Sequence, residues 1–152
     1  SSPETLWSQD RFNRSNGAIR ITNVNNYQQL PASTYFGTQF TITVWIKNYD
    51  CSIVTARIID CGYQNNGLFD SVILAMNFYD NCKPDFCIVL SINNHAYLTY
   101  TYSYNNQTQM LNKWTHLAAV YNVNYVSIYM DGNLLISGNM FATRNVTRNS
   151  CR

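Results

Sequence analysis

Few side chains in this sequence could act chemically on a substrate, and their spacing limits what they could do. The acidic residues are Glu4, Asp10, Asp50, Asp60, Asp70, Asp80, Asp85 and Asp131. Retaining glycoside hydrolysis needs two carboxyl groups ~5 to 5.5 Å apart, which two acids at positions i and i+2 of a strand would provide. No acids have that spacing, and no serine elbow, phosphate loop or zinc-binding histidine pair occurs. We therefore expect a protein that is not an enzyme, although acids from different strands could still meet.

One histidine, His116, has a setting that permits several roles. It lies in the stretch "NKWTHLAAVY", two residues after Trp114, so a strand would place both side chains on one face. A catalytic base would need a nucleophile or an acid partner, and the sequence supplies no credible one. The remaining roles are those of a core residue and of a ligand contact.

The cysteines indicate disulfide bonds. They are Cys51, Cys61, Cys82, Cys87 and Cys151, and their spacing does not form the paired CxxC motif of a metal site. Cys82 and Cys87 enclose "KPDF", and a proline-containing turn of that size would bring them within bonding distance. Cys51 and Cys61 bracket a predicted hairpin and are expected to lie close enough to pair, which leaves Cys151 for a partner in another segment. Five free thiols in a cytosolic protein are the alternative.

Two further sets of residues could carry attached glycans or bind saccharides. Asn13, Asn106 and Asn145 begin Asn-x-Ser/Thr sequons, of which Asn106 in "NNQTQ" is expected to be the best exposed. Tyr100, Tyr102 and Tyr104 would share one face of a strand in "AYLTYTYSY". We prefer an aromatic ladder in the core for these tyrosines, with a platform that stacks on sugar rings as the alternative.

The elements that must position these residues are strands. Nine short segments rich in β-branched and aromatic residues are separated by turn-forming residues: 18–22, 40–47, 56–62, 71–78, 86–92, 96–104, 113–121, 125–130 and 133–138. Asp131 and Gly132 provide a two-residue hairpin turn between the last two. Helical periodicity is absent, and 46% hydrophobic residues suffice for one core. The pattern predicts one all-β sandwich or barrel.

Charge and hydropathy argue against two classes of partner. The chain carries a formal net charge of +2, and its basic residues are scattered rather than gathered in the stripe that nucleic acid binding requires. No apolar run approaches the ~20 residues that cross a bilayer. We therefore expect neither nucleic acid binding nor membrane insertion.

A family resemblance rests on several blocks that occur in order. These are "DRFNRSNGAIRI", "LPAS", "FTITVWIK", "RIIDCG", "VILAM", "KWTHLAAVY" and "VSIYMDGNLL". From about Asp10 to Arg148 the chain resembles the laminin-G-like members of the concanavalin-A-like lectin superfamily. The resemblance implies an antiparallel jelly-roll β-sandwich for residues 1–152, in a family whose members mostly bind glycans, matrix proteins or receptors outside cells.

The resemblance also implies roles for individual residues. The imidazole of His116 is expected to serve structure, and Trp45, Trp114 and His116 are expected in the core. Relatives often hold a Ca²⁺ ion at the rim of the sandwich, but no set of residues matches that site, since Asp70 and Asp80 would lie at opposite ends of one strand. We therefore expect no cofactor, with Ca²⁺ as an unmatched alternative. The family pattern also extends beyond both ends, so the chain is expected to lack its first and last strands.

Taken together, these features predict a non-enzymatic recognition or adhesion module, extracellular or at the cell surface, that binds glycan or protein. Disulfide bonds and N-glycosylation would fit that location. The main alternative is a structural subunit or spacer of a filament, appendage or matrix, whose partners are neighbouring subunits. A glycoside hydrolase accessory module is a remote alternative.

Overall fold

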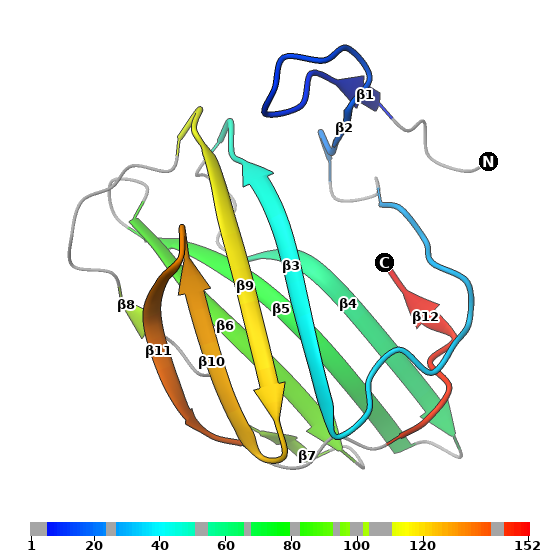
Figure 1. The fold of residues 1–152 in the computed structure, drawn as a ribbon. Helices are drawn as coiled ribbons and strands as arrows, with labels where there is room; N and C mark the ends of the chain where they lie inside the picture. The colour runs from blue at the N-terminus through cyan, green and yellow to red at the C-terminus, as the bar shows by residue number, and fades with distance from the viewer. Residues whose placement is uncertain are drawn as a thin grey trace.

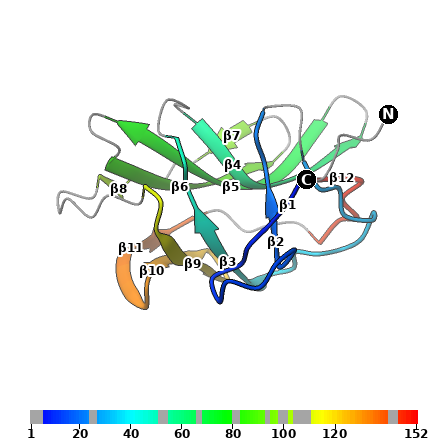
Figure 2. The same cartoon turned by 90° about the horizontal axis from the view of Figure 1, so that it is seen from above.

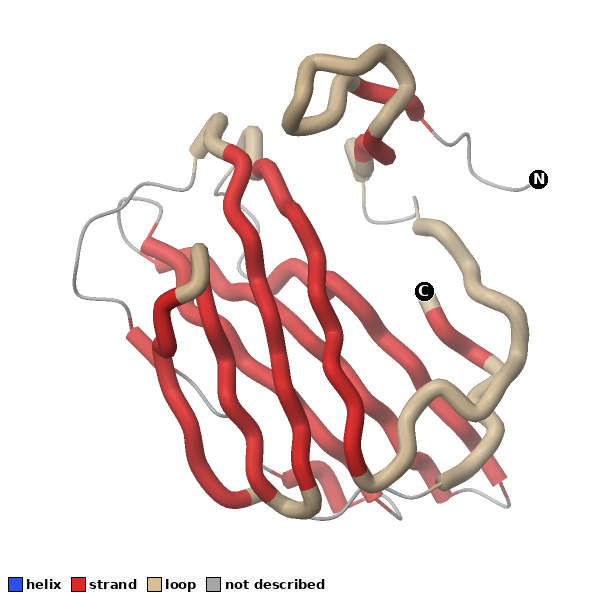
Figure 3. Tube along the Cα trace, in the orientation of Figure 1, coloured by secondary structure: helices blue, strands red, loops and turns tan. Residues whose placement is uncertain are grey.

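The computed structural model describes residues 6–23, 27–50, 55–65, 68–79, 83–92, 95–97, 102–103, 111–140 and 145–152. Within these ranges the chain forms strands, turns and loops without a helix (Figure 3). The described residues therefore contain no helix that could cross a membrane. The strands are β1 (Leu6–Ser8), β2 (Ala18–Arg20), β3 (Gln39–Lys47), β4 (Thr55–Asn65), β5 (Leu68–Tyr79), β6 (Lys83–Ile92), β7 (His95–Tyr97), β8 (Tyr102–Ser103), β9 (Trp114–Asn122), β10 (Tyr125–Met130), β11 (Asn133–Asn139) and β12 (Ser150–Cys151).

Two antiparallel sheets lie face to face, as Figures 1 and 2 show. The first has four strands in the order β11-β10-β9-β3. The second has the order β12-β4-β5-β6-β7, and β8 also pairs with β6. A separate two-stranded sheet of β1 and β2 lies near the end of β3 (Figure 1). The predicted all-β sandwich is confirmed.

Alternating side chains explain why these strands form two layers. In β9, residues Thr115, Leu117, Ala119 and Tyr121 are buried, and the residues between them are half-buried. The even-numbered residues of β3 from Phe40 to Ile46 pack against the same core, while the odd-numbered residues Thr41, Thr43 and Trp45 are exposed. A period of two residues is what a sheet with one covered face requires. The outer face of the four-stranded sheet therefore carries Trp45 and His116.

The core lies between the sheets and is built from both. Val72, Leu74 and Met76 of β5 face Leu117 and Ala119 of β9 and the buried residues of β10 in one cluster. Aromatic side chains fill the end of this core. The ring of Tyr121 stacks on Phe40 at 5.0 Å, and Phe40 meets Phe36 edge to face at 4.8 Å.

The nine predicted segments coincide with strands β2 to β11, because alternation and turn residues marked each of them. Asp131 and Gly132 have φ angles of 49° and 82°, which confirms the predicted hairpin turn. Two short strands, β1 and β12, were not predicted. The segment "KPDF" is also not a turn, since Lys83 to Phe86 continue β6 and pair with β5. Similarly, Asp70 lies within β5 rather than beside it.

The predicted pairing of Cys61 with Cys51 is wrong, because Cys61 forms a disulfide bond with Cys151. These two residues are direct cross-strand partners of β4 and β12, and both are buried. Cys151 is therefore bonded within the chain and not to another segment. Cys51 and Cys82 lie outside the described residues, so the Cys82–Cys87 pair stays a prediction, without the turn that suggested it.

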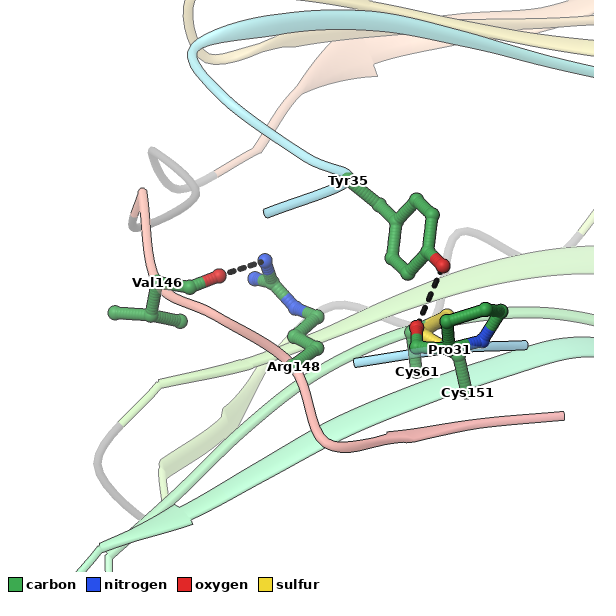
Figure 4. The surroundings of a disulfide bond; sticks show 6 residues. All are labelled: Pro31, Tyr35, Cys61, Val146, Arg148 and Cys151. Atoms are coloured by element: carbon green, nitrogen blue, oxygen red, sulfur yellow. Dashed lines mark hydrogen bonds between the residues drawn. A yellow bond between two sulfur atoms is a disulfide. The ribbon is translucent and has the colours of Figure 1, made fainter. Parts of the chain in front are cut away.

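The C-terminal segment runs between β4 and an earlier part of the chain. Leu30 forms a bridge with Cys151, and Ser33 forms one with Arg148. Arg148 is 1% exposed, donates a hydrogen bond to the carbonyl of Val146 at 3.4 Å, and holds its guanidinium 5.2 Å from the centroid of the Phe36 ring. Figure 4 shows Arg148 and Val146 near the disulfide bond between Cys61 and Cys151. The covalent bond thus fixes this segment at the edge of the second sheet, beside β4. The expectation that further strands precede and follow the chain stays a prediction, but Cys151 no longer supports it.

Candidate ligand-binding face

The most distinctive surface of the described chain is organised by a loop between β1 and β2. Asp10 begins this loop, and the residue is 7% exposed. One carboxylate oxygen accepts hydrogen bonds from the backbone N–H groups of Phe12 at 2.8 Å and Arg14 at 3.0 Å. The other accepts the Nε–H of Arg14 at 2.6 Å and pairs with its Nη2 at 2.6 Å. A short acidic side chain that binds the following N–H groups is typical of a tight turn, and here it holds residues 11–14 in one conformation.

The same contacts set the pKa of Asp10. Burial on its own raises the pKa of this carboxyl, but hydrogen bonds from the Arg14 side chain and from the N–H groups of Arg14 and Phe12, with the charge of Arg14, outweigh it. The pKa of Asp10 therefore lies below its usual value of 3.8.

A pH dependence of the loop follows from this shift. A carboxyl with a lowered folded-state pKa stabilises the fold above its unfolded-state pKa and stops doing so as the pH falls through the folded value. We expect the amide resonances of Phe12 and Arg14 to keep their hydrogen-bonded shifts down to pH 3.8, the usual pKa of an aspartate, and to lose them only at lower pH, while resonances of β9 do not change. The control Asp10→Asn should lack this titration; an unchanged titration in that variant would assign it to another group.

On the outer face of the four-stranded sheet, Trp45 and His116 are cross-strand partners. Their rings lie 5.0 Å apart at 44°. Trp45 is 41% exposed, and His116 is half-buried. The backbone of His116 is fixed by the β10–β11 turn, because its N–H donates to Asp131 Oδ1 at 2.9 Å and its C=O accepts from the Asp131 N–H at 2.9 Å. The Trp45 ring therefore packs against a histidine whose backbone is held in place by two hydrogen bonds.

The loop and the sheet meet through an arginine. The guanidinium carbon of Arg11 lies 4.1 Å from the centroid of the Phe12 ring and 4.3 Å from that of Trp45. The guanidinium carbon of Arg14 also lies near the Phe12 ring, 5.1 Å from its centroid. We call Arg11, Phe12, Arg14, Trp45 and His116 the Trp45 cluster. Such distances are those of cation–π contacts.

A second group of the same kind lies next along the chain. The guanidinium of Arg20 is 5.0 Å from the centroid of the Tyr49 ring, and the Lys47 ammonium is 5.3 Å from it. Tyr49 is 48% exposed. Lys47 is two residues from Trp45 in β3, on the same outer face, so the two groups form one aromatic and cationic surface.

Two further carboxylates of the described ranges, Asp60 and Asp131, lie close to cations. Asp60 pairs with Arg57 and, at 3.7 Å, with Arg152, and Lys113 lies 3.9 Å from Asp131. Within those ranges no three residues of the types His, Cys, Asp and Glu gather in a way that could hold a metal ion. The Ca²⁺ alternative is not tested by this, because Asp80 and the side chain of Asp70 are outside what the structure describes.

The predicted site residues are distributed as follows. Trp45 is not a core residue, and Trp114 and His116 are half-buried on the outer face rather than between the sheets. The reason is their position in the strand. The side chains that point toward the core are those of the even-numbered residues of β3 and the odd-numbered residues of β9. Asn13 and Asn145 are exposed, as glycosylation would need. Tyr100, Tyr104 and Asn106 and the side chain of Tyr102 lie outside the described residues.

Sequence reasoning missed Arg11 and Phe12 as site residues. A signal was present, because the "DRFNR" stretch begins with an acid that can bind the next N–H groups and carries two arginines around an aromatic residue. What it could not show is that this loop reaches the outer face at Trp45.

Comparison with known proteins agrees with this fold. A family model described as the concanavalin A-like lectin/glucanases superfamily matches residues 22–151. No curated protein sequence matches the chain. A 1,3-α-1,4-β-D-galactose-4-sulfate-3,6-anhydro-D-galactose 4-galactohydrolase has a similar structure, with a TM-score of 0.52, 10% identity and 80% of this chain covered. Domain 4 of AbnA, a GH43 extracellular arabinanase from Geobacillus stearothermophilus in complex with arabinotriose, has a TM-score of 0.50, 13% identity and 81% coverage.

The extent of these matches limits what they establish. The chain spans 50% and 62% of the two similar structures, and identities of this size support the fold alone. The family match begins at Thr22, so the block "DRFNRSNGAIRI" lies outside it even though it contributed to the resemblance. The match nevertheless takes in most of the chain and both sheets, and the chain belongs to the concanavalin A-like lectin/glucanases superfamily.

Proposed function

We propose that this chain is a non-enzymatic extracellular recognition module that binds a saccharide on the Trp45 cluster. The observation that carries the proposal is the pair of exposed aromatic rings, Trp45 at 41% and Phe12 at 59%, on either side of Arg11. The apolar faces of sugar rings stack on exposed aromatic rings, and neighbouring polar groups bind the hydroxyls. Trp45 is held by His116 and Arg11, so the surface is already formed before a ligand binds.

Three further observations support this proposal. Asp10, Asp60 and Asp131 lie on separate elements, and each binds a cation or a backbone N–H. This arrangement does not favour a catalytic pair of carboxyl groups. The buried disulfide bond suits an oxidising compartment, and therefore an extracellular site of action. The complex of the AbnA domain with arabinotriose gives a precedent for saccharide binding by a domain of similar structure.

Trp45→Ala tests the proposal. We expect the variant to lose roughly tenfold or more of its affinity for saccharides that the wild type binds on a glycan array, which corresponds to ~1.4 kcal/mol. The free energy of unfolding should change by under ~1 kcal/mol, because the side chain is on the outer face.

Tyr125→Ala is a matched control. Tyr125 is 46% exposed at the start of β10, on the same sheet, and its pairing partner Asn122 lies about 20 Å along β9 from His116. This variant should bind like the wild type. Equal losses in the two variants would refute a site at Trp45.

A structural subunit is the second candidate, and one observation favours it. Trp7 and Ile19 are cross-strand partners in the β1–β2 sheet and are 60% and 45% exposed. Exposed apolar pairs of this kind are common in protein contacts. A glycan array without binding, together with concentration-dependent assembly in light scattering, would favour this candidate over saccharide recognition.

A further inference from the structure

The β1–β2 hairpin lies outside the part of the chain that the family model matches. Its residues 6–20 precede the matched range, which begins at Thr22. The hairpin strands pair with each other and with neither larger sheet. Nevertheless the hairpin supplies Arg11, Phe12 and Arg14 to the Trp45 cluster. These three residues therefore bring to the cluster side chains from outside the matched range.

Arg11 is held by ring contacts, and this leaves its N–H donors available. A guanidinium is planar, with five N–H groups in its plane, so contact through its faces does not use them. No hydrogen bond or ion pair engages the Arg11 side chain within the described ranges; its contacts there are with Phe12 and Trp45. Arg14 of the same loop, by contrast, forms a hydrogen bond and an ion pair with Asp10. Arg11 is thus oriented without being neutralised.

The surface around Arg11 carries further cations. Arg20 and Lys47 contact Tyr49, and within the described ranges no carboxylate forms an ion pair with either. The two described carboxylates nearest the cluster along its own elements are occupied: Asp10 by Arg14, and Asp131 by the His116 N–H and Lys113. A ligand that stacks on Trp45 therefore meets the guanidinium of Arg11, with two further cations at Tyr49.

We infer that the hairpin makes this site selective for saccharides that carry a carboxylate or sulfate group, and that Arg11 binds that group. This inference rests on the proposed saccharide site at Trp45. A guanidinium fork matches the paired oxygens of a carboxylate or sulfate, and such charge-assisted hydrogen bonds are about twice as strong as neutral ones. Arg20 and Lys47 would add attraction that salt screens.

The test uses matched saccharides that differ in charge. The probes are oligogalacturonate and its methyl ester, and a sulfated galactan oligosaccharide and its desulfated form. Calorimetry on the whole chain should show at least one anionic member bound roughly tenfold or more tightly than its neutral counterpart. The two pairs distinguish a carboxylate from a sulfate ligand. Equal affinity within both pairs would overturn the inference.

Variants identify the residue responsible. Arg11→Gln should remove most of the preference for the anionic member and reduce its salt dependence, whereas Arg11→Lys should keep the salt dependence and lose affinity, because it lacks the planar fork. Arg57→Gln removes one charge from β4 of the other sheet and should bind like the wild type. Unchanged preference in Arg11→Gln would refute the role of Arg11.

The outcomes also separate this inference from the proposed function. Binding that needs Trp45 but ignores charge would leave the saccharide site in place and refute its selectivity. No binding of any probe or array saccharide, neutral or anionic, would refute both.

Discussion

Replacing both Cys61 and Cys151 by alanine is expected to lower the melting temperature by roughly 5 to 15 °C. The bond joins residues 90 positions apart, and the loss of a native disulfide of this kind costs about 2 to 5 kcal/mol. For a chain of this size each 1 kcal/mol shifts the melting temperature by about 2 to 4 °C. Differential scanning calorimetry measures the shift.

The structure explains why this bond should matter so much. β12 has only two residues, and the backbone hydrogen bonds that hold its segment run to Leu30, Ser33 and Asp60. Without the covalent bond these few contacts must retain the segment alone, and the buried Arg148 would be exposed with it. We therefore expect the segment 145–152 to lose protection from hydrogen exchange before the rest of the sandwich.

Reduction provides the control for the cysteine variant. A reductant should lower the melting temperature of the wild type more than that of the Cys61→Ala/Cys151→Ala variant, because the variant no longer has this bond to lose. A double variant that melts within about 2 °C of the wild type would contradict the role given to the bond, since it would mean a cost below ~1 kcal/mol.

The fold could be predicted from the sequence because its signals are local. Alternation in "FTITVWIK" and "KWTHLAAVY" marks strands, and Asp131 with Gly132 marks a turn, without knowledge of any partner strand. The same alternation already placed Trp45 with Thr43 and Lys47, on the polar face of its strand. The core assignment of Trp45, which followed from the family resemblance, was wrong because this position lies on the exposed face of β3.

The disulfide pairing and the site depend on contacts between distant segments. Cys61 and Cys51 are close in sequence, yet the partner of Cys61 is set by β12 lying beside β4. Spacing does not determine such connectivity. Likewise, the contact of Arg11 with Trp45 joins a loop to a strand more than thirty residues later, and no periodicity in either segment indicates it.

Gly17→Ala is expected to disrupt the Trp45 cluster while the sandwich stays folded. A Cβ at position 17 would lie 2.7 Å from Oδ2 of Asp10 and 2.8 Å from its Cγ, closer than carbon atoms approach in proteins. The Asp10 side chain cannot move without breaking its bonds to Phe12 and Arg14. The loop should therefore shift and withdraw Arg11 and Phe12 from Trp45.

The expected readouts separate the loop from the body of the protein. The indole N–H resonance of Trp45 should move, and affinity for the bound saccharide should fall by at least as much as in Arg11→Gln, because two contacts are lost together. The melting temperature should stay within about 2 °C, since β1 and β2 pair with neither larger sheet. Gly37→Ala is the matched control, because a Cβ there meets no atom within 4 Å, and it should change none of these.

A double variant shows whether the clash with Asp10 is the cause. If Gly17→Ala acts by displacing Asp10, then Asp10→Ala should have a similar effect on the Trp45 resonance and on affinity, and combining the two should add little to either alone. Independent, additive losses would mean that position 17 affects the loop by another route. A Gly17→Ala variant that binds like the wild type would show that the hairpin need not be held in this position for saccharide binding, and that Trp45 alone provides the affinity.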